Sequence, residues 1–68
     1  MAIVKVIEVL AESKESWEAA AEEALKEASM TVKNIQSIYV KEMQAIVREN
    51  KIVNYRINAK ISFLVEGK

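Results

Sequence analysis

The 68-residue chain contains no cysteine, no histidine, no proline and no aspartate, and its one glycine is Gly67. Without cysteine there are no disulfide bonds and no thiolate metal sites. Without histidine as well, the usual base that activates a nucleophile and the usual zinc ligands are missing. Glu, Lys and Tyr can still transfer protons, but nothing in their spacing indicates a catalytic site. We therefore expect a protein that is not an enzyme.

A chain of this length forms one domain at most, here residues 1–68. It buries only about 60% of the surface that its unfolded chain exposes, and small domains usually add disulfides, metals or oligomerisation. The first segment, "MAIVKVIEVLAES", carries Lys5 and Glu8 and is too short and too charged for a signal peptide or a membrane span. A cytoplasmic protein is the expectation.

Charge is unevenly distributed although the net charge is zero. Residues 1–32 carry three Lys and seven Glu, a charge of −4, whereas residues 33–68 carry seven Lys or Arg and three Glu, a charge of +4. Such asymmetry is typical of an interface or of an anionic ligand. An acidic, solvated helix in the first half is the simpler explanation and accounts for most of it.

A helix is predicted over residues 13–32, with Ser13 as N-cap and Ser16 as the alternative. Apolar side chains recur there at helical spacing, as one stripe made mostly of alanine: Trp17, Ala20, Ala21, Ala24, Leu25, Ala28 and Val32. A stripe of small residues favours close packing onto a sheet. Asn34 is the expected C-terminal stop.

Three strands are predicted, over residues 2–10, 35–48 and 52–65, and the polar segment 48–51 joins the last two as a hairpin. The first strand has apolar residues on both faces, which indicates that both faces are covered. In the second strand the apolar parity switches near residues 42–43, which a bulge, a bend or a change of partner would explain.

The predicted fold class is α+β, in the order β-α-β-β, with a three-stranded antiparallel sheet and one helix on one face. One alanine-rich helix cannot cover two strands that span roughly 45 Å at about 3.3 Å per residue. The remaining surface is either solvated or paired with copies of the chain, and the first strand favours a closed symmetric homo-oligomer.

The third strand alternates most cleanly over "VNYRINAKISF", residues 53–63. Tyr55 and Phe63 lie on its apolar parity and are expected in the core with Trp17, whereas Tyr39 is expected to be more exposed. Its polar parity comprises Asn54, Arg56, Asn58, Lys60 and Ser62. That face is either an ordinary solvated surface or the wall of a cavity between subunits that holds an anionic or heteroaromatic ligand. Nucleic acid is a weaker alternative, because no row of exposed aromatics accompanies the cations.

Several strings in the chain resemble the dodecins: "KVIEV" (5–9), "ESWEAAAEEAL" (15–25), "TVKNI" (31–35) and "YRINAKISF" (55–63). Dodecins are small proteins whose antiparallel sheet partly wraps one helix, and twelve copies form a hollow shell. Many bind flavins in pairs and store or quench them without catalysis. The resemblance implies the same shell here, with a flavin such as FMN or riboflavin as ligand.

In flavin-binding dodecins a Trp early in the second strand stacks on the flavin ring, and a Gln on the third strand hydrogen-bonds its polar edge. The resemblance places these positions at Ser37 and Arg56, with Glu42 nearby as a further site residue. Ser37 supplies no stacking surface, whereas Arg56 still offers donors to a carbonyl or phosphate. A branch of the family that lacks the Trp includes calcium-binding members. The alternative is therefore a scaffold that does not bind flavin or a calcium-stabilised shell, whose ligands would be Glu, carbonyl oxygens and water.

Overall fold

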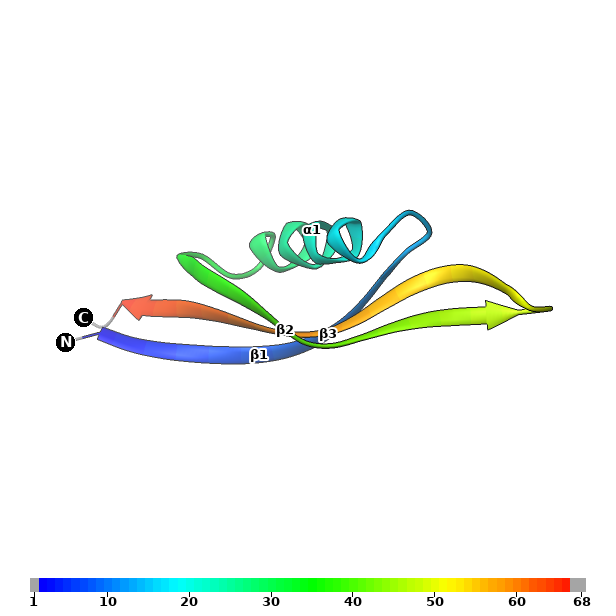
Figure 1. Ribbon diagram of the computed structural model, residues 1–68. Helices are drawn as coiled ribbons and strands as arrows, with labels where there is room; N and C mark the ends of the chain where they lie inside the picture. The colour runs from blue at the N-terminus through cyan, green and yellow to red at the C-terminus, as the bar shows by residue number, and fades with distance from the viewer. Residues whose placement is uncertain (1, 67–68) are drawn as a thin grey trace.

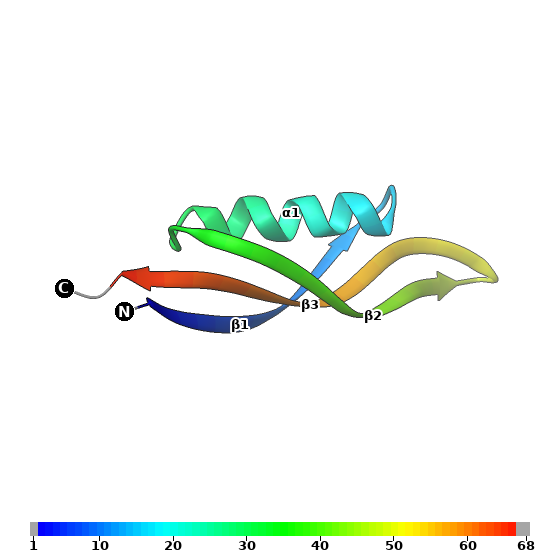
Figure 2. The ribbon, with the colours of Figure 1, turned by 60° about the vertical axis from the view of Figure 1, so that its left-hand side comes forward.

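The computed structural model describes residues 2–66, which form β1 (Ala2–Ser13), α1 (Trp17–Ser29), β2 (Ile35–Arg48) and β3 (Lys51–Glu66). The three strands make one antiparallel sheet in the order β1-β3-β2. The predicted fold class, β-α-β-β with a three-stranded antiparallel sheet and one helix, is confirmed. Figures 1 and 2 show α1 lying along one side of the sheet, with β2 and β3 continuing beyond it as a two-stranded arm.

The helix begins later than predicted, because Ser16 rather than Ser13 is the N-cap. The Ser16 side chain accepts a hydrogen bond of 2.9 Å from the Ala19 amide. Ser13 instead ends β1, and its Oγ accepts a hydrogen bond from the Glu15 amide, 3.0 Å away, in the connecting turn. The helix also ends earlier, at Ser29, and Asn34 takes a left-handed conformation (φ 64°) directly before β2.

The core lies between the alanine stripe of α1 and the apolar parity of β3. The buried side chains form two adjoining clusters: Ala20, Ala24 and Ala28 from the helix, and Ile57, Ala59 and Ile61 from the strand. Methyl side chains on α1 let the helix approach the sheet closely, as the sequence predicts. We call this side of the sheet the inner face and the opposite side the outer face.

Trp17 lies at the margin of this core and not within it, since 36% of its surface is exposed. Its ring meets the Tyr55 ring edge-on, with centroids 4.9 Å apart and planes at 73°. Its Nε1 donates a hydrogen bond of 2.9 Å to the carbonyl oxygen of Gln44. The first turn of the helix is thereby joined to both strands of the arm.

The pairing of β2 with β3 is irregular where the sequence changes parity. The register shifts between Val40 and Glu42, so that Lys41 is an extra residue on β2. Val40 pairs with Ala59 and Met43 with Ile57, which places both on the inner face although their numbers differ in parity. Of the three explanations open from the sequence, a bulge is the one that the structure has.

The chain is elongated, with extents of 53 × 19 × 13 Å. Its radius of gyration is 14.0 Å, whereas a compact domain of this length has a value of about 11 Å. Most of the excess comes from the arm, which ends in a two-residue turn whose residues, Glu49 and Asn50, both have positive φ (51° and 65°). A single copy therefore leaves much of its sheet without a covering layer.

Candidate ligand-binding site

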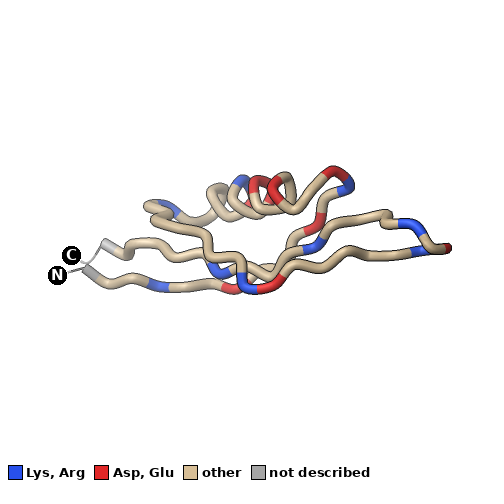
Figure 3. The backbone as a smooth tube through the Cα atoms, in the orientation of Figure 1, with Lys and Arg blue, Asp and Glu red and all other residues tan. Residues whose placement is uncertain are grey.

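The outer face carries the polar parity of β3 along its middle, flanked by β1 and β2. Each β3 residue from Tyr55 to Phe63 has one neighbour on either side, so that Arg56 lies between Glu12 and Gln44, and Lys60 between Glu8 and Tyr39. Positive and negative positions are consequently neighbours across the middle of the sheet (Figure 3). This face holds all three residues that the sequence nominates, Ser37, Glu42 and Arg56.

Ser37 is exposed near the start of β2 and pairs with Ser62. The two hydroxyl oxygens are 2.6 Å apart, and one donates a hydrogen bond to the other. A short polar pair thus occupies the place where the resemblance expects a large aromatic platform.

Arg56 is fixed by a carboxylate on the neighbouring strand. Its Nε and Nη2 both donate to Glu12 Oε2, each at 2.7 Å, and the Nδ2 of Asn54 donates to Glu12 Oε1 at 3.0 Å. Two of the five guanidinium N–H groups are used in this way, which leaves three for another acceptor. The cation is half-exposed, with 37% of its side chain accessible.

Glu42 pairs with Asn58 on β3, and no ion pair to Glu42 is found within residues 2–66. The Oδ1 atom of Asn58 is buried and lacks a hydrogen-bond partner among the described residues. Leaving a buried acceptor unpaired costs about 1–3 kcal/mol. This position, beside the bulge of β2, is one where a ligand, a water molecule or a second copy of the chain would complete the structure.

Tyr39 is the aromatic side chain of the outer face that the sequence did not nominate as a site residue. It pairs with Lys60 and is 64% exposed, two residues along β2 from Ser37. The neighbouring Lys41 forms an ion pair with Glu8 of β1, with 3.8 Å between Nζ and Oε2. The tyrosine ring therefore stands beside two lysines, with Lys60 directly opposite it and Lys41 two residues along β2.

The three nominated residues do not form one site within a single chain. Ser37 pairs with Ser62, six residues along β3 from Arg56, a distance of roughly 20 Å at about 3.3 Å per residue. Glu42 lies between them, beside Asn58. A site that contains both Ser37 and Arg56 therefore has to take these residues from different copies of the chain. Sequence reasoning missed Glu12 as a member of the face, because its position opposite Arg56 depends on a register that alternation alone does not give.

Residues 2–66, which the structure describes, hold no group of three or more acidic, histidine or cysteine side chains close enough to share a metal ion. The single helix found there is also too short and too polar to cross a membrane.

Comparison with known proteins identifies the family. A model of the Dodecin family matches residues 3–66. The chain belongs to the dodecin family. Dodecins are non-catalytic proteins that bind small ligands, so the expectation that the chain is not an enzyme is confirmed by its family.

The relatives include proteins with different stated ligands. The calcium dodecin of Mycobacterium tuberculosis is 36% identical over 63 residues, which cover 93% of this chain and 89% of that protein. Its crystal structure, described as that of a calcium-chelating antigen with a novel calcium-binding site, superposes with a TM-score of 0.83 at 33% identity, over 97% of this chain and 94% of that one. An arginine-to-alanine variant of the Thermus thermophilus dodecin has a TM-score of 0.93 at 26% identity, over the whole of both chains.

Proposed function

We propose that this dodecin assembles into a hollow homododecamer and that the assembly binds a flavin, such as FMN or riboflavin, on the outer faces of its sheets. The flavin is stored or sequestered there and undergoes no reaction. The observation that carries the ligand proposal is the exposed Tyr39 ring on the same face as Ser37, Glu42 and Arg56.

Self-association is supported by surface that one copy leaves uncovered. The chain exposes 5378 Å², whereas a compact monomer of 7.7 kDa exposes about 4,300 Å². The excess is comparable with the roughly 800 Å² that each partner buries in a stable interface. Large apolar side chains are more than half exposed on both faces of β1, among them Ile3 on the inner face and Val4, Val6 and Leu10 on the outer face.

Tyr39 is suited to the stacking role that Ser37 cannot fill. An aromatic ring offers a flat apolar surface, and aromatic pairs contribute about 0.5–1.5 kcal/mol beyond the area that they bury. Lys60, directly opposite Tyr39, and Lys41, two residues along β2, add positive charge for an anionic tail such as the FMN phosphate. In an assembly with two-fold axes, two copies of Tyr39 would enclose a ligand or a pair of ligands.

The polar edge of a flavin ring has carbonyl acceptors and one imide N–H donor, and the outer face has groups for both. Arg56 keeps three unused N–H donors while Glu12 fixes its plane. Asn58 Oδ1 is an acceptor without a partner among residues 2–66, and it becomes available to the imide when its side chain turns outward. The donor and acceptor set therefore fits the ligand class, with Arg56 contributed by a different copy from Ser37.

Calcium is the second candidate, favoured by the 36% identity to a calcium dodecin. Calcium takes six to eight oxygen ligands, and the outer carboxylates Glu8 and Glu12 already pair with cations. Glu42 has no ion-pair partner within residues 2–66, so a calcium site would need Glu42 from several copies around a symmetry axis.

Size-exclusion chromatography of the purified protein with FMN, monitored at flavin wavelengths, tests both parts of the proposal. We expect a coloured peak near twelve times 7.7 kDa and quenching of flavin fluorescence on titration.

Tyr39→Ala should weaken flavin binding by about tenfold or less, and Tyr39→Phe should retain it. Elution as a monomer would contradict the assembly, and the absence of quenching at high micromolar flavin would contradict the ligand. A thermal midpoint that falls with a chelator and ignores flavin would favour calcium.

A further inference from the structure

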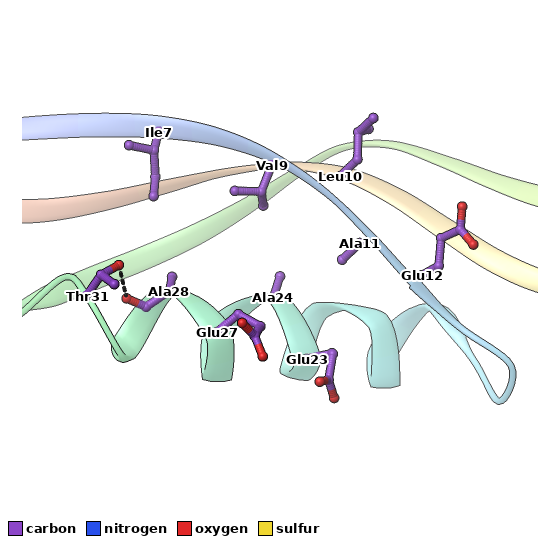
Figure 4. Close-up of a pocket in the computed structure, with 10 residues that line it drawn as sticks. All are labelled: Ile7, Val9, Leu10, Ala11, Glu12, Glu23, Ala24, Glu27, Ala28 and Thr31. Atoms are coloured by element: carbon purple, nitrogen blue, oxygen red, sulfur yellow. Dashed lines mark hydrogen bonds between the residues drawn. The ribbon is translucent and has the colours of Figure 1, made fainter.

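The ion pair between Lys41 and Glu8 joins the two edge strands of the sheet across the strand that separates them. β1 alternates about the sheet, with Ile7 and Val9 reaching toward α1 and Leu10 pointing away from it (Figure 4). Glu8 shares the parity of Leu10 and therefore lies on the outer face. Because neighbouring strands are about 4.8 Å apart, the pair spans about 10 Å from β1 to β2. Both side chains have to be extended to meet.

The contact at the end of this span is weak. Nζ of Lys41 and Oε2 of Glu8 are 3.8 Å apart, and about half of each side chain is exposed. Exposed ion pairs of this kind contribute little to stability. Lys41 is also the extra residue of the β2 bulge, so no cross-strand partner on β3 fixes its direction. Its ammonium group can therefore exchange one anion for another.

A second lysine is placed to pair with the carboxylate that Lys41 would leave. Lys60 is the cross-strand partner of Glu8 on β3, with Tyr39 on its other side. Within residues 2–66 Lys60 forms no ion pair, although it lies on the strand next to Glu8 and Lys41 lies one strand farther away. When Lys41 turns away, Lys60 can neutralise Glu8. The exchange then leaves no carboxylate unpaired.

The side chain of Lys41 passes beside the unpaired acceptor of Asn58. It starts next to the Glu42–Asn58 pair and ends at Glu8, so its path crosses β3 over Ala59, whose methyl group faces α1. Asn58 Oδ1 is buried there without a hydrogen-bond partner among residues 2–66. Because an unpaired buried acceptor destabilises the arrangement that buries it, departure of Lys41 is favoured by the access that water or a ligand gains to this atom.

Glu42 determines on which side of Lys41 an anion is accepted. It follows Lys41 on β2, pairs with Asn58 on the outer face, and forms no ion pair among the described residues, 2–66. Its carboxylate repels an anion on the arm side of the bulge. On the other side of Lys41 stands the exposed ring of Tyr39. An anionic group is therefore expected beside Tyr39, within reach of the Lys41 ammonium group.

We propose that Lys41 selects flavins that carry a phosphate. When FMN binds, the ammonium group of Lys41 leaves Glu8 and donates to the phosphate. Lys60 then pairs with Glu8, and Asn58 Oδ1 is uncovered. Riboflavin lacks the phosphate and leaves Lys41 on Glu8. The inference rests on the flavin binding of the proposed function, and it names the ligand that the site prefers and the residue that recognises it.

Fluorescence titrations of the purified protein with FMN and with riboflavin test the inference, because the two ligands differ only in the phosphate. The measured quantity is the ratio of the riboflavin Kd to the FMN Kd. We expect a ratio of about five to ten at low salt, and a smaller one at high salt, which screens exposed charges. Lys41→Met should lower the ratio to about one through loss of FMN affinity alone, whereas Lys41→Arg keeps the charge and should keep most of the preference.

Two further variants test the exchange of partners. Lys60→Met removes the residue that would pair with Glu8 and should lower the preference for FMN. Adding Glu8→Gln to this variant releases Lys41 and should restore the preference. If the preference is not restored, Lys60 acts on the phosphate directly, and the exchange is overturned.

The matched control is Lys14→Met, which removes one exposed lysine charge in the turn between β1 and α1. It should leave both dissociation constants unchanged. The inference is overturned if Lys41→Met keeps the ratio, if it weakens both flavins equally, or if the control lowers the ratio to the same extent. All three results leave flavin binding itself standing, whereas an unaltered chain that quenches neither flavin would refute the proposed function first.

Discussion

Glu12 of β1 and Arg56 of β3 are cross-strand partners that meet through a single carboxylate oxygen, Oε2, at 2.7 Å from both Nε and Nη2. The second carboxylate oxygen accepts from Asn54, so the carboxylate ties two side chains of β3 to β1. Both charged groups are more than one third exposed, and exposed pairs of this kind contribute about 0–1 kcal/mol to stability. The main consequence is the orientation of the guanidinium on the proposed ligand face.

Replacing Glu12 by Gln should therefore affect ligand binding more than folding. The free energy of unfolding should fall by less than about 1 kcal/mol, whereas flavin affinity should fall about three- to tenfold as Arg56 loses its fixed plane. Denaturant unfolding and fluorescence titration measure the two quantities. Glu8→Gln is the control, because its ion pair with Lys41 is longer, at 3.8 Å. Equal flavin affinity in the Glu12 and Glu8 variants would show that the carboxylate does not orient Arg56.

Ser37→Trp should strengthen flavin binding. The substitution adds an aromatic surface beside Tyr39, and a stacking contribution of about 0.5–1.5 kcal/mol corresponds to a gain of about two- to tenfold. It also removes the hydrogen bond between the hydroxyl groups of Ser37 and Ser62. Ser62→Ala removes the same bond without adding a ring and should leave flavin affinity unchanged. Affinity that does not rise in the tryptophan variant would place the ligand elsewhere.

The order of elements and the faces of β3 were predictable because β3 is the central strand. Both its edges are paired, and α1 covers one face alone, so its apolar and polar residues alternate without interruption from Val53 to Phe63. The alanine stripe likewise predicted close helix packing, since the same small residues are the ones that the structure buries. Local pattern and tertiary environment agree in these segments.

The register of the strands could not be predicted in this way. Shifts at three places in the β2–β3 pair decide which residues face each other, and they depend on backbone geometry that side-chain alternation does not encode. The Glu12–Arg56 pair depends in the same way on the register of β1 against β3. The exposed position of Tyr39, in contrast, was expected from the sequence and is confirmed. The resemblance nominated Ser37 and Arg56 for a site between subunits, and roughly 20 Å of strand separates them within one copy.

The sequence offered two N-caps for the helix, Ser13 and Ser16, and the structure has Ser16. The substitution Ser16→Ala tests how much this N-cap contributes to stability. Removing the side chain that accepts from the Ala19 amide should lower the free energy of unfolding by about 1 kcal/mol, within a range of 0.5–2. Urea unfolding at fixed protein concentration gives the value, since assembly makes stability depend on concentration. Ser13→Ala, which deletes the acceptor in the preceding turn, should cost less. A larger effect at Ser13 would mean that the turn, not the cap, sets the helix start.

Ala20→Leu tests whether the helix must lie this close to the sheet. Ala20 is fully buried against Ala59 and Ile57, and three added carbon atoms have no space there unless α1 moves away from β3. Overpacking of this kind costs about 1–3 kcal/mol, and the displaced helix would also lie farther from the sheet. Ala19→Leu is the matched control, because Ala19 precedes it on the helix and lines the polar surface with Glu15 and Glu22. Thermal unfolding at equal concentration should separate the two variants clearly. If both variants lower the midpoint equally, the alanine stripe does not set the distance between the helix and the sheet.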